Sequence, residues 1–446
     1  YVNYVFAEVE GFSNFGSYVG NGSTSGPTVV TGFEPAFVMI KASGAASFGR
    51  GVWIMKDNKR DTTNPNSANL YANFSNAEDN SSVADVNFLA NGFELAGTYG
   101  GINESGISYI YMAFAADPTT IEPTLEDSFN TVLYSGNSST QSVTGVGFQP
   151  DFTWIKSRNA SWSNMVTDSV TGGGLYLSTN TTNVQAANSS APTFDSDGFT
   201  LGGGNTIWNG SGLNYVAWNW KGAEIPAINS NGSIPSVVSA NPAAGFSIVS
   251  YTNTTSGTAD QRYTIGHGLD SAPDLIITKV RNVDGYRWTT YNSFNGTGQY
   301  MALNETRAST AFARAFPVIP SSTVFTLDEA WPYPVNGSAI AYCFAEVAGF
   351  SKFGSYSGTG VNGNSITTGF EPAFLMVKRS NAADNWVIVD NKRGTSNSLF
   401  PDLSSQELSN SGAATFSSTG FTVNGASGGW NNSTSTYIYM AFANQF

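Results

Sequence analysis

A tryptophan followed four residues later by an acid or an amide is the pattern in this sequence best suited to binding chemistry. The run from Trp53 to Arg60 reads Trp-Ile-Met-Lys-Asp-Asn-Lys-Arg, and the run from Trp386 to Arg393 reads Trp-Val-Ile-Val-Asp-Asn-Lys-Arg. At a spacing of four along a strand, the tryptophan and the acid point to the same side. An indole stacked on a sugar ring, with carboxylate, amide and guanidinium groups bonding the hydroxyls, would form a glycan-binding platform.

The same spacing joins Trp288 to Asn292, whereas Trp162 lies six residues before Asp168 and departs from the pattern. The residues predicted to bind a glycan are Trp53, Asp57, Asn58, Arg60, Trp288, Asn292, Trp386, Asp390, Asn391 and Arg393. The competing interpretation places each tryptophan in a core and uses the Asp-Asn pair to cap a turn. Recurrence of the pattern in segments whose surfaces otherwise differ favours the structural interpretation.

Other site chemistries have few residues to draw on. His267 is the only histidine and Cys343 the only cysteine, so metal sites built from His or Cys clusters are excluded by count. His267 lies in a glycine-flanked turn, and Cys343 in an apolar run that predicts a buried, inert thiol. Calcium sites made of Asp and Asn oxygens stay open.

Paired carboxylates for glycoside hydrolysis are the main enzymatic alternative. The acids Asp117, Glu122, Glu126 and Asp127 gather in one short segment, and no acidic pair recurs along the chain. We therefore expect no catalytic residues, no cofactor and no enzymatic activity.

One strand motif occurs four times and would position these residues. Gly369-Phe-Glu-Pro-Ala-Phe-Leu-Met-Val-Lys378 is nearly repeated at 32–41, with relatives at 147–156 and 268–279. Glycine followed by proline predicts a turn that feeds an extended segment. The apolar run predicts a strand covered on both faces, with the lysine at its solvent edge. A period of roughly 100 residues matches a small domain.

The fold predicted is all-β, a tandem array of four related β-sandwich, jelly-roll-like domains. Strand-like runs with Gly, Asn and Pro turns, and no amphipathic helix of ten or more residues, support this class. Residues 1–10 match 339–348 at a constant offset and are interpreted as the closing strand of an upstream repeat. The predicted order is then repeat 1 at 11–116, a linker at 117–128, repeat 2 at 129–222, a proline-containing linker at 223–244, repeat 3 at 245–347 and repeat 4 at 348–446.

Composition limits the partners. The chain of 446 residues carries a net charge of −13, which argues against nucleic acid, because phosphate binding needs clustered Lys and Arg. No run of 18 apolar residues is present, so no membrane insertion is expected.

Taken together, the recurrent strings resemble the repeated β-domains of uncharacterised function in tail-fibre and other virion surface proteins of aquatic tailed phages, cyanophages among them. The strings are Gly266 to Lys279, Ala341 to Tyr356, the Trp-x3-Asp-Asn-Lys-Arg block and Tyr437 to Ala443. The resemblance spans all four repeats and is weakest in repeat 2, which departs in the tryptophan block.

The resemblance implies a non-enzymatic virion structural protein, a tail fibre or capsid-surface fibre exposed on the particle. Its expected partners are other virion proteins, further copies of itself in a homo-oligomer such as a trimer, and a host-surface glycan bound in a lectin-like way. Two alternatives stay open: a polysaccharide depolymerase of the tailspike kind, and a cellular surface adhesin.

Overall fold

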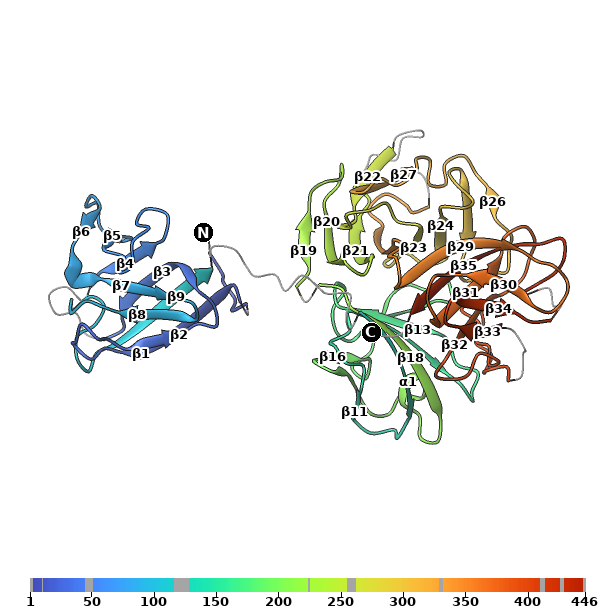
Figure 1. The fold of residues 1–446 in the computed structure, drawn as a ribbon, viewed down its shortest axis with the longest axis horizontal. Helices are drawn as coiled ribbons and strands as arrows, with labels where there is room; N and C mark the ends of the chain where they lie inside the picture. Colours follow the sequence, from blue (N-terminus) through green and yellow to red (C-terminus); the bar gives the residue numbers. More distant parts are fainter. Residues whose placement is uncertain are drawn as a thin grey trace. The chain divides into compact units, whose positions relative to one another are not determined.

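The structure is a computed structural model in which the chain divides into two compact units, unit 1 at Tyr1–Ile121 and unit 2 at Glu122–Phe446 (Figure 1). Each unit is described separately. The described residues are 3–9, 11–44, 51–115, 128–223, 225–254, 262–328, 332–409, 414–425 and 429–443. The described part of the chain is almost entirely antiparallel β-structure, which confirms the all-β, multi-domain sandwich class.

Unit 1 holds repeat 1, a sandwich of two antiparallel sheets. The larger sheet runs β1-β9-β3-β4-β5-β6 and the smaller β2-β8-β7. The bounds are β1 Ser13–Val19, β2 Thr28–Val30, β3 Pro35–Ala42, β4 Trp53–Asp57, β5 Ala68–Tyr71, β6 Asp79–Asn80, a 3-10 turn at Ser82–Ala84, β7 Val86–Leu89, β8 Gly92–Leu95 and β9 Ser108–Ala115.

Unit 2 holds repeats 2, 3 and 4. Repeat 2 has the sheets β10-β18-β12-β13-β14-β15 and β11-β17-β16, the same topology as repeat 1. The bounds are β10 Phe129–Ser135, β11 Gln141–Thr144, β12 Phe152–Ser157, β13 Met165–Asp168, β14 Leu175–Ser178, β15 Ala186–Ala187, β16 Thr193–Asp195, β17 Gly198–Leu201, α1 Thr206–Asn209 and β18 Asn214–Trp220.

Repeat 3 has the sheets β19-β20-β21-β28-β23-β24-β25-β26 and β22-β27, and repeat 4 has β29-β35-β31-β32 and β30-β34-β33. The bounds in repeat 3 are β19 Ala227–Asn229, β20 Ser236–Asn241, β21 Phe246–Thr252, β22 Arg262–Gly266, β23 Leu275–Val280, β24 Thr289–Asn292, β25 Gln299–Ala302, β26 Thr310–Ala311, β27 Val324–Asp328 and β28 Ser338–Phe344. The bounds in repeat 4 are β29 Ser351–Ser357, β30 Asn364–Thr367, β31 Pro372–Arg379, β32 Trp386–Asp390, β33 Ala414–Ser417, β34 Gly420–Val423 and β35 Thr436–Ala443.

The Gly-Pro entry of each motif strand forms as predicted. Gly32, Gly147 and Gly369 share a φ of 89°, a left-handed conformation that glycine adopts without steric cost. The prolines Pro35 and Pro372 then open β3 and β31. The turn therefore sets the register in which each motif strand joins its sheet.

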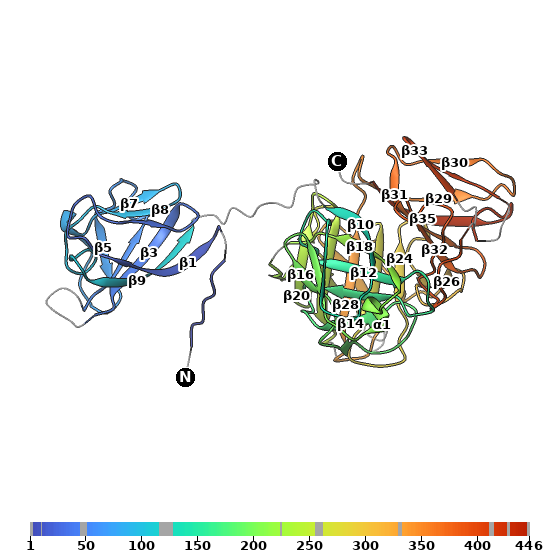
Figure 2. The ribbon, with the colours of Figure 1, turned by 90° about the horizontal axis from the view of Figure 1, so that it is seen from below.

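Residues alternate along each motif strand between two different environments. In β31, Leu375 and Val377 belong to the side that faces the small sheet of their own repeat, and Phe374 and Met376 to the opposite side. Both sides are buried in unit 2. The reason is a second core, shared by repeats 2, 3 and 4, in which the outer faces of their three large sheets meet. Figure 2 shows the green, yellow and orange-red parts of unit 2 gathered in one body.

The structure departs from the predicted organisation in two segments. The predicted linker at 223–244 instead contributes β19 and β20 to the sheet of repeat 3, because Val238 reaches that repeat's core. Residues 3–8, predicted as part of a closing strand, form no strand in the structure. In the predicted linker at 117–128, all residues but Ser128 lie outside the described residues.

Candidate functional site

The centre of unit 2 is an aromatic cluster with one ring from the closing strand of each repeat. Trp220, Phe344 and Phe442 occupy the same place in β18, β28 and β35. Their ring centroids are 6.2 Å apart for Trp220–Phe344, 5.7 Å for Trp220–Phe442 and 6.0 Å for Phe344–Phe442. Such near-equal separations of equivalent residues indicate an approximate threefold arrangement of the three repeats.

The tryptophans predicted to bind a glycan hold this arrangement together. The indole Nε1 of Trp288 donates to the carbonyl oxygen of Ser178 at 2.8 Å, and that of Trp386 to the carbonyl oxygen of Ala302 at 2.9 Å. Both indoles are almost fully buried. Each bond runs from one repeat to the preceding one.

Repeat 2 closes the same ring with a different side chain. Asn164 stands four residues before Asp168, where the other repeats have tryptophan, and its Nδ2 donates to the carbonyl oxygen of Phe400 in repeat 4 at 3.0 Å. Trp162, which the sequence singled out, is 39% exposed and does not occupy the equivalent position. Strand pairing shows that Ser178, Ala302 and Phe400 are equivalent positions in their repeats.

The lysines that end the motif strands form a second ring of bonds between repeats. Lys156 Nζ donates to the carbonyl oxygen of Ser404 at 2.8 Å, Lys279 Nζ to that of Thr182 at 2.9 Å and Lys378 Nζ to that of Thr306 at 3.0 Å. The three side chains are buried, so the prediction of a solvent-edge lysine is wrong for these three strands, while Lys41 of repeat 1 is half-buried. Burial lowers the pKa of each from 10.5 to about 8.

A third ring joins main chains. The amide N of Gln185 bonds the carbonyl oxygen of Arg281, the N of Glu407 that of Arg158, and the N of Ser309 that of Ser380, each with an N···O distance of 2.8 Å. The carboxylate of Glu407 also accepts hydrogen bonds from Nε and Nη2 of Arg158, at 3.1 and 3.0 Å. Equivalent residues thus make equivalent bonds at all three boundaries between repeats, 2 with 3, 3 with 4 and 4 with 2. Each boundary is called a joint below.

The acid of the tryptophan block lies at the same joints. Asp168 accepts a hydrogen bond from the hydroxyl of Tyr342 at 2.8 Å, and Asp390 accepts one from Trp218 Nε1 at 3.0 Å. Asp390 is also paired with Arg393, whose Nε lies 2.6 Å from its Oδ2. Burial raises the pKa of the Asp168 carboxyl.

The third joint lacks this bond. There Met440 takes the place of Trp218 and Tyr342, and Asn292 the place of the two aspartates. The Nδ2 of Asn292 has no hydrogen-bond partner among the described residues.

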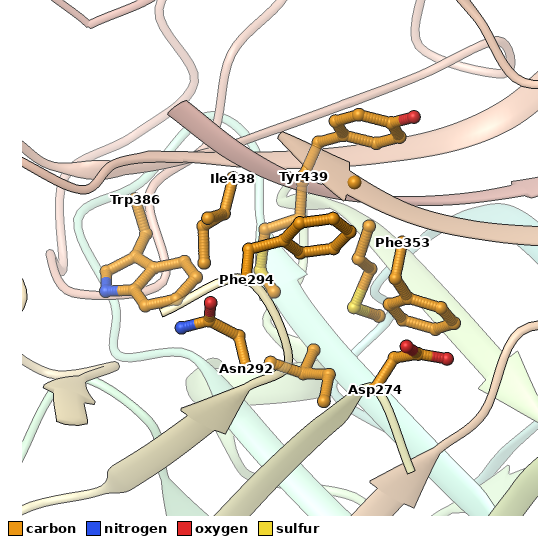
Figure 3. Close-up of a pocket in the computed structure, with 11 residues that line it drawn as sticks. Asp274, Asn292, Phe294, Phe353, Trp386, Ile438 and Tyr439 are labelled. Carbon is orange, nitrogen blue, oxygen red and sulfur yellow. The ribbon is translucent and has the colours of Figure 1, made fainter. Parts of the chain in front are cut away.

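A small hollow remains at this joint, and Figure 3 shows Asn292 and Trp386 facing it with Phe353 and Ile438 on its walls. The space holds about one water molecule. It is too small for a sugar ring.

In repeat 1 the tryptophan block is more accessible. Trp53 and Asp57 are half-buried, and Asp57 caps the turn by accepting from the amide N of Lys59 at 3.0 Å and of Arg60 at 2.8 Å. Arg60 Nε pairs with the same carboxylate at 2.6 Å and Nη1 with Glu78 at 2.5 Å. Asn58 continues the turn through its amide N, which bonds the carbonyl oxygen of Ala36 at 3.0 Å.

The structure therefore separates the predicted site residues into two groups. Trp288, Asn292, Trp386, Asp390 and Arg393 are buried between repeats, and Asn391 is exposed beside them. Glycan binding by the block stays a prediction, and its accessible candidates are Asn391 and the four residues of repeat 1. Sequence reasoning missed the role of the lysines and of Asn164. The only signal for the lysines is their fixed position at the end of each motif strand, and Asn164 has none.

The remaining polar candidates have structural partners. His267 is buried; its Nδ1 accepts from the amide N of Leu269 at 3.1 Å, and its Nε2 lies 3.1 Å from the carbonyl oxygen of Ser321. Burial lowers the pKa of His267 and raises that of the Cys343 thiol. Among the described residues, no three His, Cys, Asp or Glu side chains are placed to hold a metal ion, and no helix is long and apolar enough to cross a membrane.

These features define a repeat protein of β-sandwich domains, three of which close around a common aromatic core. The chain belongs to the family described as a domain of unknown function, DUF7483, whose model matches residues 1–118 and 124–445. No curated protein and no solved structure matches the chain.

Proposed function

We propose that the protein is a non-enzymatic structural component of a bacteriophage virion, a tail fibre or capsid-surface fibre exposed on the particle. The observation that supports a structural role is that the side chains best suited to bind a ligand connect neighbouring repeats instead. In unit 2 the tryptophans, the lysines and the acids of the block bond neighbouring repeats rather than line an open cleft. The phage origin is supported by the resemblance of the repeated strings.

The outer surface would then make the contacts of the fibre. Charged residues are 11% of the chain, so the surface is polar but sparsely charged. Such a surface suits hydrogen bonding to neighbouring virion proteins or to host glycans. Several weak sites on one chain would act together, because tethering raises their effective concentration.

Immunogold electron microscopy of purified source particles tests this function. Antibody raised against the full chain should label a fixed place on the particle, and the protein should remain with particles through density-gradient purification. Recovery only from the soluble fraction would defeat the proposal. Incubation of the chain with host polysaccharide provides a second check, since release of oligosaccharides would establish a depolymerase instead.

A further inference from the structure

We infer that the outer face of the large sheet in repeat 1 is an assembly surface, and that its occupants are the same faces of two further copies of this chain. Three chains would then form a homotrimer through repeat 1, built like the three repeats of unit 2. This inference does not depend on the proposed function.

The first support is that side chains exposed on repeat 1 are buried at the equivalent positions of the other repeats. Ile110 in β9 is 43% exposed, whereas its counterpart Ile438 in β35 is 5% exposed and Ile340 in β28 is fully buried. The same contrast holds along the strands: from Phe37 onward the outward residues of β3, and those of β4 and β9, are half-buried or exposed. Those of β31, β32 and β35 are buried, except Thr436 at the start of β35. Repeat 1 thus leaves uncovered a face that every other repeat covers with two neighbours.

That face is apolar in the way that an interface requires. Its apolar residues are Phe15, Phe37, Met39, Trp53, Met55, Ile110, Met112 and Phe114. Lys41 and Asp57 lie on the same side, as their counterparts Lys378 and Asp390 do in repeat 4. Contiguous apolar surface of this kind on a folded domain marks an interaction site. Phe114 occupies the position of Trp220, Phe344 and Phe442, so three copies would rebuild the aromatic triangle.

The second support is that repeat 1 has both the donor and the acceptor of the hydrogen bonds that join neighbouring repeats in unit 2. Trp53 stands where Trp386 and Trp288 donate, and the carbonyl of Tyr71 stands where those of Ala302 and Ser178 accept. The indole of Trp53 has no hydrogen-bond partner among the described residues. By the same spacing, Glu78 and Ser43 correspond to Glu407 and Arg158, which are joined N···O at 2.8 Å. Donor and acceptor on one repeat allow identical copies to close a ring.

The third support is a ring that already sits on this face. Phe6 packs on Phe114 with centroids 5.9 Å apart and planes at 64°, and Phe344 packs on Phe442 at 6.0 Å and 62°. Phe6 is itself 56% exposed. The face therefore accepts an aromatic ring from another segment, and in the trimer the next copy's Phe114 would take the place that Phe6 occupies on Phe114.

The mass of the full chain in solution tests the inference. Sedimentation equilibrium at tens of micromolar chain should give three times the 47.1 kDa of one chain. Ile110→Glu should return the mass to one chain with unchanged circular dichroism, because a charge on this face blocks burial without touching the core. Val30→Glu is the matched control, since Val30 is 65% exposed on the other sheet, and it should stay trimeric.

A covalent trap tests the register. In unit 2 the counterparts of Ser43 and Glu78 share a main-chain hydrogen bond, which places their Cα atoms near the range of about 4.4–6.8 Å that a disulfide spans. Ser43→Cys combined with Glu78→Cys should oxidise to a three-chain species on a non-reducing gel, and Ser43→Cys alone should give at most dimers. A monomeric wild-type chain, or a trimer that survives Ile110→Glu, would overturn the inference.

Discussion

Trp386 donates its indole N–H to the main-chain carbonyl oxygen of Ala302 across the boundary between repeats 4 and 3, at 2.9 Å. The bond links two positions 84 residues apart and recurs in the pair Trp288–Ser178. A side chain with the hallmarks of a ligand platform is therefore a connector between repeats. The stability of unit 2 should depend on these connectors.

Replacing Trp386 by alanine should destabilise unit 2 by about 3–5 kcal/mol, because it removes a buried indole and leaves a cavity. Trp162→Ala is the control, since that indole is 39% exposed, and it should cost no more than about 0.5 kcal/mol. Nine of the ten tryptophans lie in unit 2, so tryptophan fluorescence during urea unfolding follows this unit. Equal effects of the two substitutions would contradict the role given to Trp386.

Neighbouring tryptophans of β18 separate hydrogen bonding from packing. Trp218 donates to the buried Asp390 at 3.0 Å, whereas the indole N–H of Trp220 has no partner among the described residues. Trp218→Phe should therefore cost about 1–3 kcal/mol more than Trp220→Phe, since it leaves a buried acceptor short of a donor. Phenylalanine already occupies the place of Trp220 in repeats 3 and 4. Urea unfolding of the two variants side by side measures the difference.

The sequence was sufficient for the class of fold and for the entry of each motif strand. Glycine and proline act through local backbone geometry, so their effect at Gly369 and Pro372 can be predicted without knowledge of distant contacts. The sequence does not show which residues of β31 face outward and which face inward, because both sides of the strand are apolar. That double burial is the signal of a shared core, but a single sequence cannot distinguish it from burial within one domain.

The candidate site could be predicted only in its residue types. Trp288 and Trp386 were identified, yet their role depends on acceptors in other repeats, and a carbonyl oxygen has no sequence signature. Asn164 was missed because an asparagine in place of a tryptophan breaks the motif while preserving its bond. The segment 223–244 was misassigned because its prolines suggested a linker, although they flank β20 rather than interrupt it.

Stability of unit 2 should rise between about pH 8 and pH 9.5. Lys156, Lys279 and Lys378 have pKa values of about 8 when folded, against 10.5 ordinarily, so in this range the unfolded chain binds more protons than the folded one. Raising the pH then favours the folded state, by on the order of 1 kcal/mol per lysine. Above this range the buried tyrosines, whose pKa values burial raises, reverse the trend. Urea midpoints measured across the range check the sign, and a falling midpoint would contradict it.

The ion pairs of Glu407 allow the stability contributed by a buried contact between repeats to be compared with that of an exposed ion pair. Glu407 is 8% exposed and pairs with Arg393, which is fully buried, at 2.8 Å, and with Arg158 of repeat 2. Burial alone would raise the pKa of Glu407, but hydrogen bonds from the two arginines hold it below its ordinary value. Glu407→Gln should cost about 1–3 kcal/mol, because it weakens the charged hydrogen bonds to Arg158 and Arg393 at a buried site, while Asp390 remains as a counter-charge for Arg393.

Glu305 is the matched control for this substitution. It also accepts from two arginines, Arg287 and Arg307, but within one repeat and with all three side chains at least a quarter exposed. Water screens such pairs, so Glu305→Gln should cost less than about 1 kcal/mol. If both variants unfold at the same urea concentration, the joint between repeats 2 and 4 does not stabilise the unit as its contacts indicate. If only Glu407→Gln shifts the midpoint, the burial of the ion pair between repeats accounts for the difference.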